Sequence, residues 1–438
     1  MGKTQSRNFF QSLLTPFGLV LLLTLVTFWV TFFTIELKSA SQIEKAVKLV
    51  SFWQDGFFSL LGFTLQMIMI LVFGYALAVY EPVNKLLRSL AGIPDSLVSG
   101  SILVASITMI AGLLNWGFGL IIGALLARSV QESLVAKGIS SNSALLAAAG
   151  YLGMGIWHGG LSGSAPLTVA GEGHFLQEKI GLISVSKTLF SSFNLITTSG
   201  LFLVFLFTVW GLSKTANTSS ESVSAIPMKP ISQGKDQNLA RVVGVVMLAV
   251  LMLGVVWGRD QGLGMISLNW VNFLLFSLVL IAFRSWDKFI LAVGEGLKAS
   301  VDILVQFPFY AGILGLLSSS GVLLQLADYI QSLTNPEFFP LITFYSAAFV
   351  NLLIPSGGGQ WAIQGPVILE AAKAWGMDLG KMTMIFSYGD QITNLLQPFW
   401  ALPLLSITGV SVRRLFPYCL ILFLSGFVFL TLAIWILY

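Results

Sequence analysis

Long apolar runs separated by short polar segments dominate the chain. Runs of about 20 apolar residues are long enough to cross the hydrocarbon core of a bilayer as α-helices. The pattern predicts full crossings near 17–35, 57–80, 141–171, 181–211, 239–257, 265–283, 299–320, 380–408 and 414–437. It therefore predicts an all-α polytopic membrane protein.

Two further apolar stretches are interrupted in their middle. Residues 97–136 are broken at 114–117, and residues 338–375 are broken at 351–359, where the sequence reads NLLIPSGGG. Lipid cannot satisfy loose backbone N–H and C=O groups, so irregular backbone at membrane depth must be buried in protein or line a cavity. Each stretch predicts a re-entrant hairpin, which is two short helices that meet at a polar tip.

A polar segment divides the chain into two halves. Residues 212–240 have no core-forming pattern and are predicted to form a cytoplasmic linker. The first half, 1–211, contains the hairpin near 97–136 and a polar-interrupted, broken helix over 141–171. The second half, 241–438, contains the hairpin near 338–375 and a broken helix over 380–408.

The two halves resemble each other weakly. At separations of 236 to 238 residues, the second half repeats residues of the first: Asn115 with Asn351, Gly138 with Gly376, Tyr151 with Tyr388, His158 with Asn394, and Pro166 with Pro403. His158 and Asn394 differ in type but occupy the same place in the order. The common order of hairpin, broken helix and last span predicts an internal repeat.

Charge distribution gives the expected orientation. With a cytoplasmic N-terminus, the 23 Lys and Arg residues divide into 15 on the inside and eight on the outside: Lys38, Lys45, Lys48, Lys179, Lys187, Arg259, Lys373 and Lys381. This bias follows the positive-inside rule and predicts an inner-membrane protein with its C-terminus outside. The two hairpins then enter from opposite sides, as in the inverted repeats of secondary transporters.

Composition supports the membrane class and excludes others. The chain of 438 residues is 56% hydrophobic and 10% charged, whereas a soluble protein carries about 25% charged residues. A net charge of +4 does not suggest a nucleic-acid partner. Cys419 is the lone cysteine, which excludes an intrachain disulfide and a thiolate metal cage. No Gly-Lys-Ser/Thr follows a glycine-rich run, so the sequence lacks a nucleotide P-loop.

The tip of the second hairpin is the first candidate site. Its residues Ser356, Gly357, Gly358 and Gly359 are followed by Gln360 and Gln364, and a helix is expected to begin at about Gln360. Glycines let the backbone approach a ligand closely, and the first N–H groups of a helix attract a carboxylate. We expect this tip to bind an anionic substrate. The alternative is a tight turn between two packed helices.

The first half offers a second group of candidates. Asn115 and Trp116 lie at the first hairpin tip, where Trp116 could line an aliphatic pocket or pack between helices. His158 lies among helix-breaking glycines, and ionisable residues at membrane depth are functional candidates by default. We expect these three residues to contribute to substrate binding. The alternative for His158 is a structural hydrogen bond to a carbonyl.

The break of the second half offers a candidate ion site. An ionised Asp390 in hydrocarbon is costly unless it is paired, hydrated, protonated or bound to a cation. Thr393, Asn394 and, from the hairpin, Asn351 supply further oxygen ligands. These residues could couple transport to Na⁺, with Asn351, Asp390 and Asn394 as the metal ligands, or to H⁺. The alternative makes Asp390 the cap of a half-helix that starts at about Gln391.

Three segments carry a resemblance to a known family. NLLIPSGGGQWAIQGPVILEAA, GYLGMGIWHGGLSGSAPLTVA and FSYGDQITNLLQPFWALPLL resemble the marked segments of the short-chain fatty acid transporter family. The resemblance covers most of the chain except the linker. It implies uptake of short monocarboxylates such as acetoacetate and butyrate. It also implies membership of the ion transporter superfamily, whose members combine two re-entrant hairpins, two broken helices and a scaffold domain.

These observations predict a secondary active importer of short-chain monocarboxylates, a symporter coupled to H⁺ or Na⁺. The alternative is an anion or cation channel that uses the hairpin tips as its filter. No nucleophile or metal-ligand spacing suggests an enzyme, and no cofactor is expected beyond the coupling ion. The expected partners are the carboxylate substrate and the lipid bilayer, and a homodimer is left open.

Overall fold

The computed structural model describes residues 16–35, 41–217, 231–232, 238–257, 266–322, 325, 329, 334–353 and 357–438. The helices of the first half are α2 (Pro16–Thr34), α3 (Gln42–Gly56), α4 (Leu61–Ala78), α5 (Glu81–Ala91), α6 (Leu97–Leu114), α7 (Trp116–Ala136), α8 (Ser143–Tyr151), the 3₁₀ turns η1 (Leu152–Gly155) and η2 (Trp157–Gly159), α9 (Ser164–Ala170), α10 (Gln177–Ile180) and α11 (Ser192–Thr215). Those of the second half are α12 (Asn238–Trp257), α13 (Leu268–Phe283), α14 (Trp286–Ala299), α15 (Val301–Ser319), α17 (Phe339–Leu353), α18 (Gly357–Ala374), α19 (Leu379–Thr393), η4 (Asn394–Leu396), α20 (Pro398–Thr408) and α21 (Val412–Leu437).

The described residues form a multi-helical protein with several membrane-spanning candidates. By length and composition, six helices can cross a membrane: α4, α6, α7, α11, α12 and α21. A seventh follows if the pair α14 and α15, bent by 51°, counts as one span. The prediction of an all-α polytopic protein is confirmed at this level.

One predicted crossing is wrong in its first third. The run 181–211 was expected to be one helix, but α11 begins only at Ser192. The side chain of Ser191 accepts a hydrogen bond from the N–H of Asn194 and so caps the helix. Residues 181–191 form turns before it. Polar Ser and Lys residues in this stretch favour turns over helix despite the apolar neighbours.

Both interrupted stretches contain two helices. In the first, the helices α6 and α7 are separated by the single residue Asn115, whose backbone is extended. The two helices pack closely. A methyl carbon placed on Gly119 would lie only 2.6 Å from Gly112 Cα. In the second, α18 begins at Gly357 rather than at the expected Gln360. Residues 354–356 lie outside the described part of the chain.

The broken helices also appear, with one correction. In the first half α8 gives way to two 3₁₀ turns before α9. In the second half α19 continues through Asp390 as far as Thr393, and α20 begins at Pro398. Asp390 therefore lies inside a helix, and the alternative that made it the cap of a half-helix starting near Gln391 is wrong. Proline lacks the N–H that a continuing helix needs, so the break falls beside Pro398.

The two halves follow the same element order at their hairpins. The second helix of each hairpin ends at a glycine with positive φ, 71° at Gly138 and 66° at Gly376. Each glycine turns the chain toward the broken helix that follows, as left-handed glycines do at helix C-termini. The pairing of these two positions agrees with the expected repeat. An inverted relation between the halves stays a prediction.

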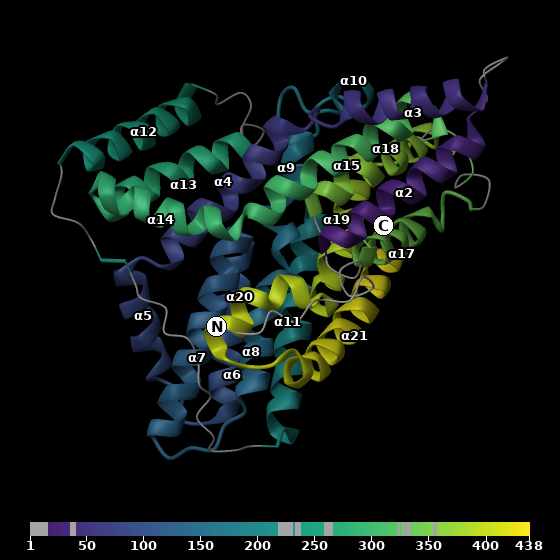
Figure 1. Ribbon diagram of the computed structural model, residues 1–438. Helices are drawn as coiled ribbons and strands as arrows, with labels where there is room; N and C mark the ends of the chain where they lie inside the picture. Colours follow the sequence, from purple (N-terminus) through teal and green to yellow (C-terminus); the bar gives the residue numbers. More distant parts are fainter. Residues whose placement is uncertain are drawn as a thin grey trace, which may run out of the picture.

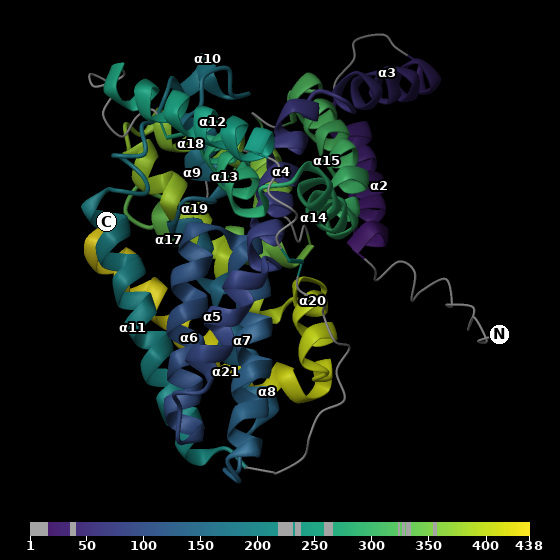
Figure 2. The same ribbon diagram turned by 90° about the vertical axis from the view of Figure 1, so that its left-hand side faces the viewer.

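The helices gather in two regions. In both views α2, α3 and α12–α15 lie in the upper part, whereas α5–α8 and much of α11 and α21 extend through the lower part (Figures 1 and 2). The hairpins and broken helices supply the buried centre, where polar residues such as Asn115, His158 and Asp390 accompany the apolar core. The candidate site lies in this centre.

Candidate functional site

The first hairpin tip is fixed to three other elements. Asn115 Nδ2 donates a 3.0 Å hydrogen bond to the carbonyl of Ile70 in the middle of α4. The N–H of Trp116 donates to Ser162 Oγ at 2.9 Å, in the break of the first half. The Trp116 ring lies 5.4 Å, centroid to centroid, from Trp400 of α20. The tip therefore joins the broken helices of both halves.

Asn115 uses both ends of its amide in this role. Besides the bond to Ile70, its Oδ1 accepts a 2.8 Å hydrogen bond from the N–H of Phe118 and caps α7. Asn115 is 1% exposed. Its contacts are those of a structural residue, and its expected contact with substrate stays a prediction.

Asn351 of the second hairpin has a different environment. Its Nδ2 lies within 2.7–2.9 Å of three acceptors, the carbonyl of Asp390, Thr393 Oγ1 and Asn394 Oδ1. An amide nitrogen carries two hydrogens, so three acceptors exceed its capacity. Its Oδ1 is buried and has no hydrogen-bond partner. The structure thus brings together the four residues proposed from the sequence for the coupling ion.

His158 and Asp390 meet across the two halves. His158 Nε2 lies 3.6 Å from Asp390 Oδ1, and both side chains are fully buried. The backbone N–H of His158 donates to Gln391 Oε1 at 3.0 Å. Ser164 Oγ lies 3.2 Å from His158 Nε2. The ionisable groups of the two breaks therefore form one cluster, although 232 positions separate them in the sequence.

The start of α18 faces this cluster. A methyl carbon placed on Gly357 would lie 2.6 Å from His158 Nε2 and 3.0 Å from Ser164 Oγ. Glycine at this position lets the helix N-terminus, with its positive dipole end, approach the imidazole and the hydroxyl. Gly357, Gly358 and Gly359 are all buried, so this turn is closed to solvent in the structure. Ser356 lies outside the described residues.

The two glutamines of α18 point mainly toward α17. Gln360 Nε2 donates to the carbonyl of Ala347 and to Gln364 Oε1, each at 2.8 Å. Gln364 Nε2 donates to Ser346 Oγ at 3.0 Å. These bonds hold the second hairpin together. Gln360 Oε1 nevertheless has no hydrogen-bond partner.

Buried oxygen atoms without hydrogen bonds mark the second break. They are Asn351 Oδ1, Gln360 Oε1, Gln397 Oε1 and both carboxylate oxygens of Asp390. Leaving such an atom unpaired costs about 1–3 kcal/mol, and more for a charged group. A bound cation or a proton would satisfy several of them. The donor set of amide, hydroxyl and carboxylate oxygens fits a hard cation.

Two participants were not identified as site residues from the sequence. Gln391 binds the backbone of His158, and Gln397 Nε2 donates to the carbonyl of Asn351 at 2.6 Å. The available signal was an amide side chain inside an otherwise apolar span. Among the described residues, no group of three or more His, Cys, Asp or Glu side chains could hold a transition metal.

Comparisons with known proteins agree on the class of protein. The sequence profile described as "Short chain fatty acid transporter" matches residues 2–437. A protein of Escherichia coli (strain K12) named "Putative short-chain fatty acid transporter" is 35% identical, with 94% of each chain covered. A protein of Haemophilus influenzae with the same name is 36% identical, with 85% of this chain and 87% of that one covered.

Solved structures share the fold. The Alcanivorax borkumensis YdaH transporter aligns with a TM-score of 0.54 at 16% identity, over 95% of this chain and 98% of its own. Neisseria gonorrhoeae MtrF, described among antimetabolite efflux pumps, aligns with a TM-score of 0.51 at 13% identity, over 95% and 94%. Such low identities establish similarity of fold alone. The profile match and the two close relatives establish more: this chain belongs to the short-chain fatty acid transporter family, a family of membrane transporters rather than enzymes.

Proposed function

We propose that this protein is a secondary active importer that takes up short-chain monocarboxylates, such as butyrate or acetoacetate, with a coupling cation. One observation carries the proposal. Asp390 Oδ1, which has no hydrogen-bond partner, lies 3.6 Å from His158 Nε2, and the N-terminus of α18 approaches the same imidazole, while Asn351 contacts the Asp390 carbonyl and leaves its own oxygen unpaired. One buried centre thus offers a place for a cation and a place for an anion. Transporter family membership supports the same conclusion.

The carboxylate would bind where α18 begins. The first N–H groups of a helix lack partners within the helix and carry its positive dipole end. Gly357 brings this end close to His158 and Ser164. Carboxylate oxygens placed there gain charge-assisted hydrogen bonds. The short aliphatic tail would contact the indole rings nearby, of which Trp157 lies 3.0 Å from a methyl carbon placed on Gly357.

The cation would bind at Asn351. Rotating its amide by 180° would exchange Nδ2 for Oδ1 and would direct an oxygen at the Asp390 carbonyl, Thr393 Oγ1 and Asn394 Oδ1. Four converging oxygens repel one another unless a cation lies among them. The present orientation, with Nδ2 facing the three acceptors, suits a site without a cation. Na⁺ suits these ligands, since hard cations prefer oxygen.

Proton coupling is the second arrangement that the centre supports. The 3.6 Å approach of His158 Nε2 to Asp390 Oδ1 allows the pair to hold one proton between two buried groups. A buried carboxylate that is neither protonated nor paired is expensive. A proton bound with the substrate would offset the charge of the anion. Dependence on Na⁺ or on pH distinguishes the two arrangements.

Alternating access would come from the hairpins and broken helices moving against a scaffold, with the two halves related by inversion. We keep the expected orientation, with a cytoplasmic N-terminus and an outside C-terminus in the inner membrane. The tips Asn115 and Asn351 belong to one chain and differ in environment. This difference favours a transporter over a channel with one repeated filter.

Counterflow of labelled butyrate in proteoliposomes tests the proposal. Vesicles preloaded with unlabelled butyrate should accumulate label transiently, and Asp390→Asn should abolish the accumulation. Asp378→Asn is the matched control, because Asp378 caps α19 at its other end and asparagine caps equally well. Absence of counterflow for butyrate, acetoacetate and lactate under any cation gradient would reject the proposal.

A further inference from the structure

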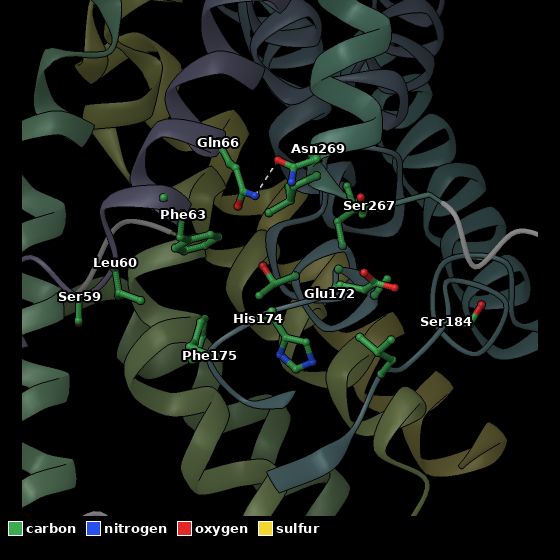
Figure 3. A pocket seen from close by; sticks show the side chains of 18 residues that line it. Ser59, Leu60, Phe63, Gln66, Glu172, His174, Phe175, Ser184, Ser267 and Asn269 are labelled. Carbon is green, nitrogen blue, oxygen red and sulfur yellow. Dashed lines mark hydrogen bonds between the residues drawn. The ribbon is translucent and has the colours of Figure 1, made fainter. Parts of the chain in front are cut away.

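A polar cavity lies apart from the buried centre. It has a volume of about 820 Å³ and is enclosed by the start of α4, the end of α9 with the loop after it, and the start of α13 (Figure 3). Polar residues from all three segments line it, among them Gln66, Thr168, Glu172, His174, Ser267 and Asn269. Gln66 Nε2 donates a 2.8 Å hydrogen bond to Asn269 Oδ1 across the cavity wall (Figure 3).

The cavity is open at its rim and closed at its floor. Rim residues such as Ser59, Glu172 and Asn269 are exposed, whereas Phe63 and Thr168 are buried. An exposed polar rim above a buried floor describes a water-accessible vestibule, because lipid would leave these polar groups unsatisfied. The segments that form the rim all belong to the side of the membrane predicted as the outside.

Phe63 forms the boundary between this cavity and the second hairpin. Its ring lines the cavity and lies 6.2 Å from the ring of Phe175 and 5.9 Å from that of Phe307. A methyl carbon placed on Gly358 would lie 2.8 Å from Phe63 Cζ and 3.2 Å from Phe307 Cζ. One aromatic ring therefore separates the cavity from the glycines at the start of α18.

Helix α9 connects the same two places. Ser164 at its first residue lies beside His158 in the buried centre, and Thr168, Ala170 and Gly171 line the cavity. Six residue steps along an α-helix cover about 9 Å. The cavity and the centre are thus about 9 Å apart, at the two ends of one short helix.

From this geometry we propose that the cavity is the outer vestibule through which a short monocarboxylate reaches the start of α18, and that Phe63 is the gate between them. The inference rests on the proposed function and adds a route and a gating residue to it. Rotation of one ring away from Gly358 would join the vestibule to the buried glycines. The structure, with these glycines buried, then represents a closed gate.

The charged and titratable residues near the rim affect how strongly the cavity attracts an anion. Glu172 is exposed there, and Lys179, which does not line the cavity, is paired with Glu370 at 2.6 Å. His174 Nδ1 accepts a hydrogen bond from the N–H of Leu176, so the imidazole is neutral. The cavity therefore offers polar contacts without net attraction for an anion. It suits transit of the substrate, whereas the helix N-terminus suits binding.

Cysteine labelling tests the route. The chain has one native cysteine, Cys419, which is buried, so Cys419→Ser gives a background for single introduced thiols. We expect an impermeant methanethiosulfonate reagent to modify Thr168→Cys, to block butyrate uptake by at least roughly tenfold, and to react more slowly when butyrate is present. Ser186→Cys is the control, exposed in the neighbouring segment but outside the cavity.

A steric pair tests the gate. Gly358→Ala should reduce uptake roughly tenfold. The added methyl group overpacks against Phe63, and the free-energy cost of such overpacking corresponds to about a tenfold change. Adding Phe63→Leu should restore uptake to within roughly twofold of the parent, since neighbouring changes couple. Phe73→Leu, on the same helix and equally buried but stacked on Phe276, should not restore it.

The outcomes separate the two proposals. Butyrate uptake by the parent protein, with no effect of labelling at Thr168→Cys and no rescue by Phe63→Leu, would overturn the vestibule and leave the proposed function standing. Failure of the parent protein to transport any short monocarboxylate would overturn both. If Thr168→Cys does not fold, Asn269→Cys at the exposed rim replaces it, with the same expected block and the same contradiction.

Discussion

The two hairpin tips carry the same residue in very different states. Asn115 uses both ends of its amide, to Ile70 and to Phe118, and holds the first hairpin in place. Asn351 offers two hydrogens to three acceptors and leaves its oxygen unpaired in a buried site. A binding site needs hydrogen-bonding groups that the fold itself leaves unpaired. The first tip thus holds the fold together, whereas the second tip keeps an unpaired oxygen for the cation that we propose.

The largest expected effect is that of Asp390→Asn. It removes the charge that would balance a cation, on a side chain whose Oδ1 lies 3.6 Å from His158 Nε2. Loss of a buried charge-assisted interaction costs up to about 3 kcal/mol, so uptake should fall roughly 100-fold. Proteoliposome uptake of butyrate measures it, with Asp378→Asn as control. Uptake within a few-fold of the parent would show that the second break does not carry coupling.

Alanine at each tip asparagine separates binding from structure. Asn351→Ala should raise the cation concentration for half-maximal uptake roughly tenfold, because an oxygen ligand is lost. Asn115→Ala should leave that concentration unchanged and lower stability by about 1–3 kcal/mol, since the Ile70 carbonyl loses its donor. Uptake titrations and thermal unfolding in detergent measure the two quantities. Equal behaviour of both variants would erase the distinction between the tips.

A glycine beside the first tip provides a smaller, purely structural effect. A methyl carbon on Gly74 would lie 2.1 Å from Asn115 Oδ1. Gly74→Ala should therefore lower stability by about 1–3 kcal/mol through overpacking. Gly62→Ala, on the same helix with nothing within 4 Å, should change stability little. Thermal unfolding compares the two variants, and a Gly74→Ala protein as stable as Gly62→Ala would show that the first tip is loosely held.

The smallest expected effect is a pH dependence of the loop that holds His174. Burial lowers the pKa of His174 below its ordinary value of 6.5, an effect partly opposed by the Gly181 carbonyl. The opened loop then binds a proton more readily than the closed one, so loop stability falls as pH drops below about 6.5. Glu172 and Glu178 flank the imidazole in sequence.

Hydrogen exchange of residues 171–181 measures this loop. Exchange should accelerate between pH 6.5 and 5 in the parent, a range set by the ordinary value of 6.5, because protonation removes the Nδ1 acceptor of the Leu176 N–H. His174→Gln should remove most of the dependence. A parent loop whose protection rises on acidification would contradict the sign.

Local sequence patterns predicted the helices better than they predicted which helices contact each other. Apolar run lengths located most helices. Gly138 and Gly376, which the sequence pairs in the predicted repeat, both have positive φ two residues after a helix, whereas the repeat itself stays a prediction. Amphipathic helices α3 and α5 were not predicted, because they are too polar to register as spans. The start of α11 at Ser192 depends on a cap that apolar composition does not reveal.

The contacts between the two halves could not be predicted from the sequence. The candidates Asn351, Asp390, Thr393 and Asn394 could be proposed because polar residues at membrane depth are costly. That His158 meets Asp390, and that Gln397 binds the Asn351 backbone, depends on how distant helices pack. The repeat indicated only which positions are equivalent. Corresponding positions in the two halves need not have the same role, because Asn115 and Asn351 make different contacts.

Gradient-driven uptake tests the central claim, that the second tip and break couple a cation to the acid. Proteoliposomes holding the parent protein or Asn351→Ala receive labelled butyrate under an inward Na⁺ gradient, an inward H⁺ gradient or none. The account predicts that one cation gradient drives butyrate above its equilibrium level in the parent, and that Asn351→Ala weakens this accumulation. Uptake that stops at equilibrium under every gradient would contradict the account.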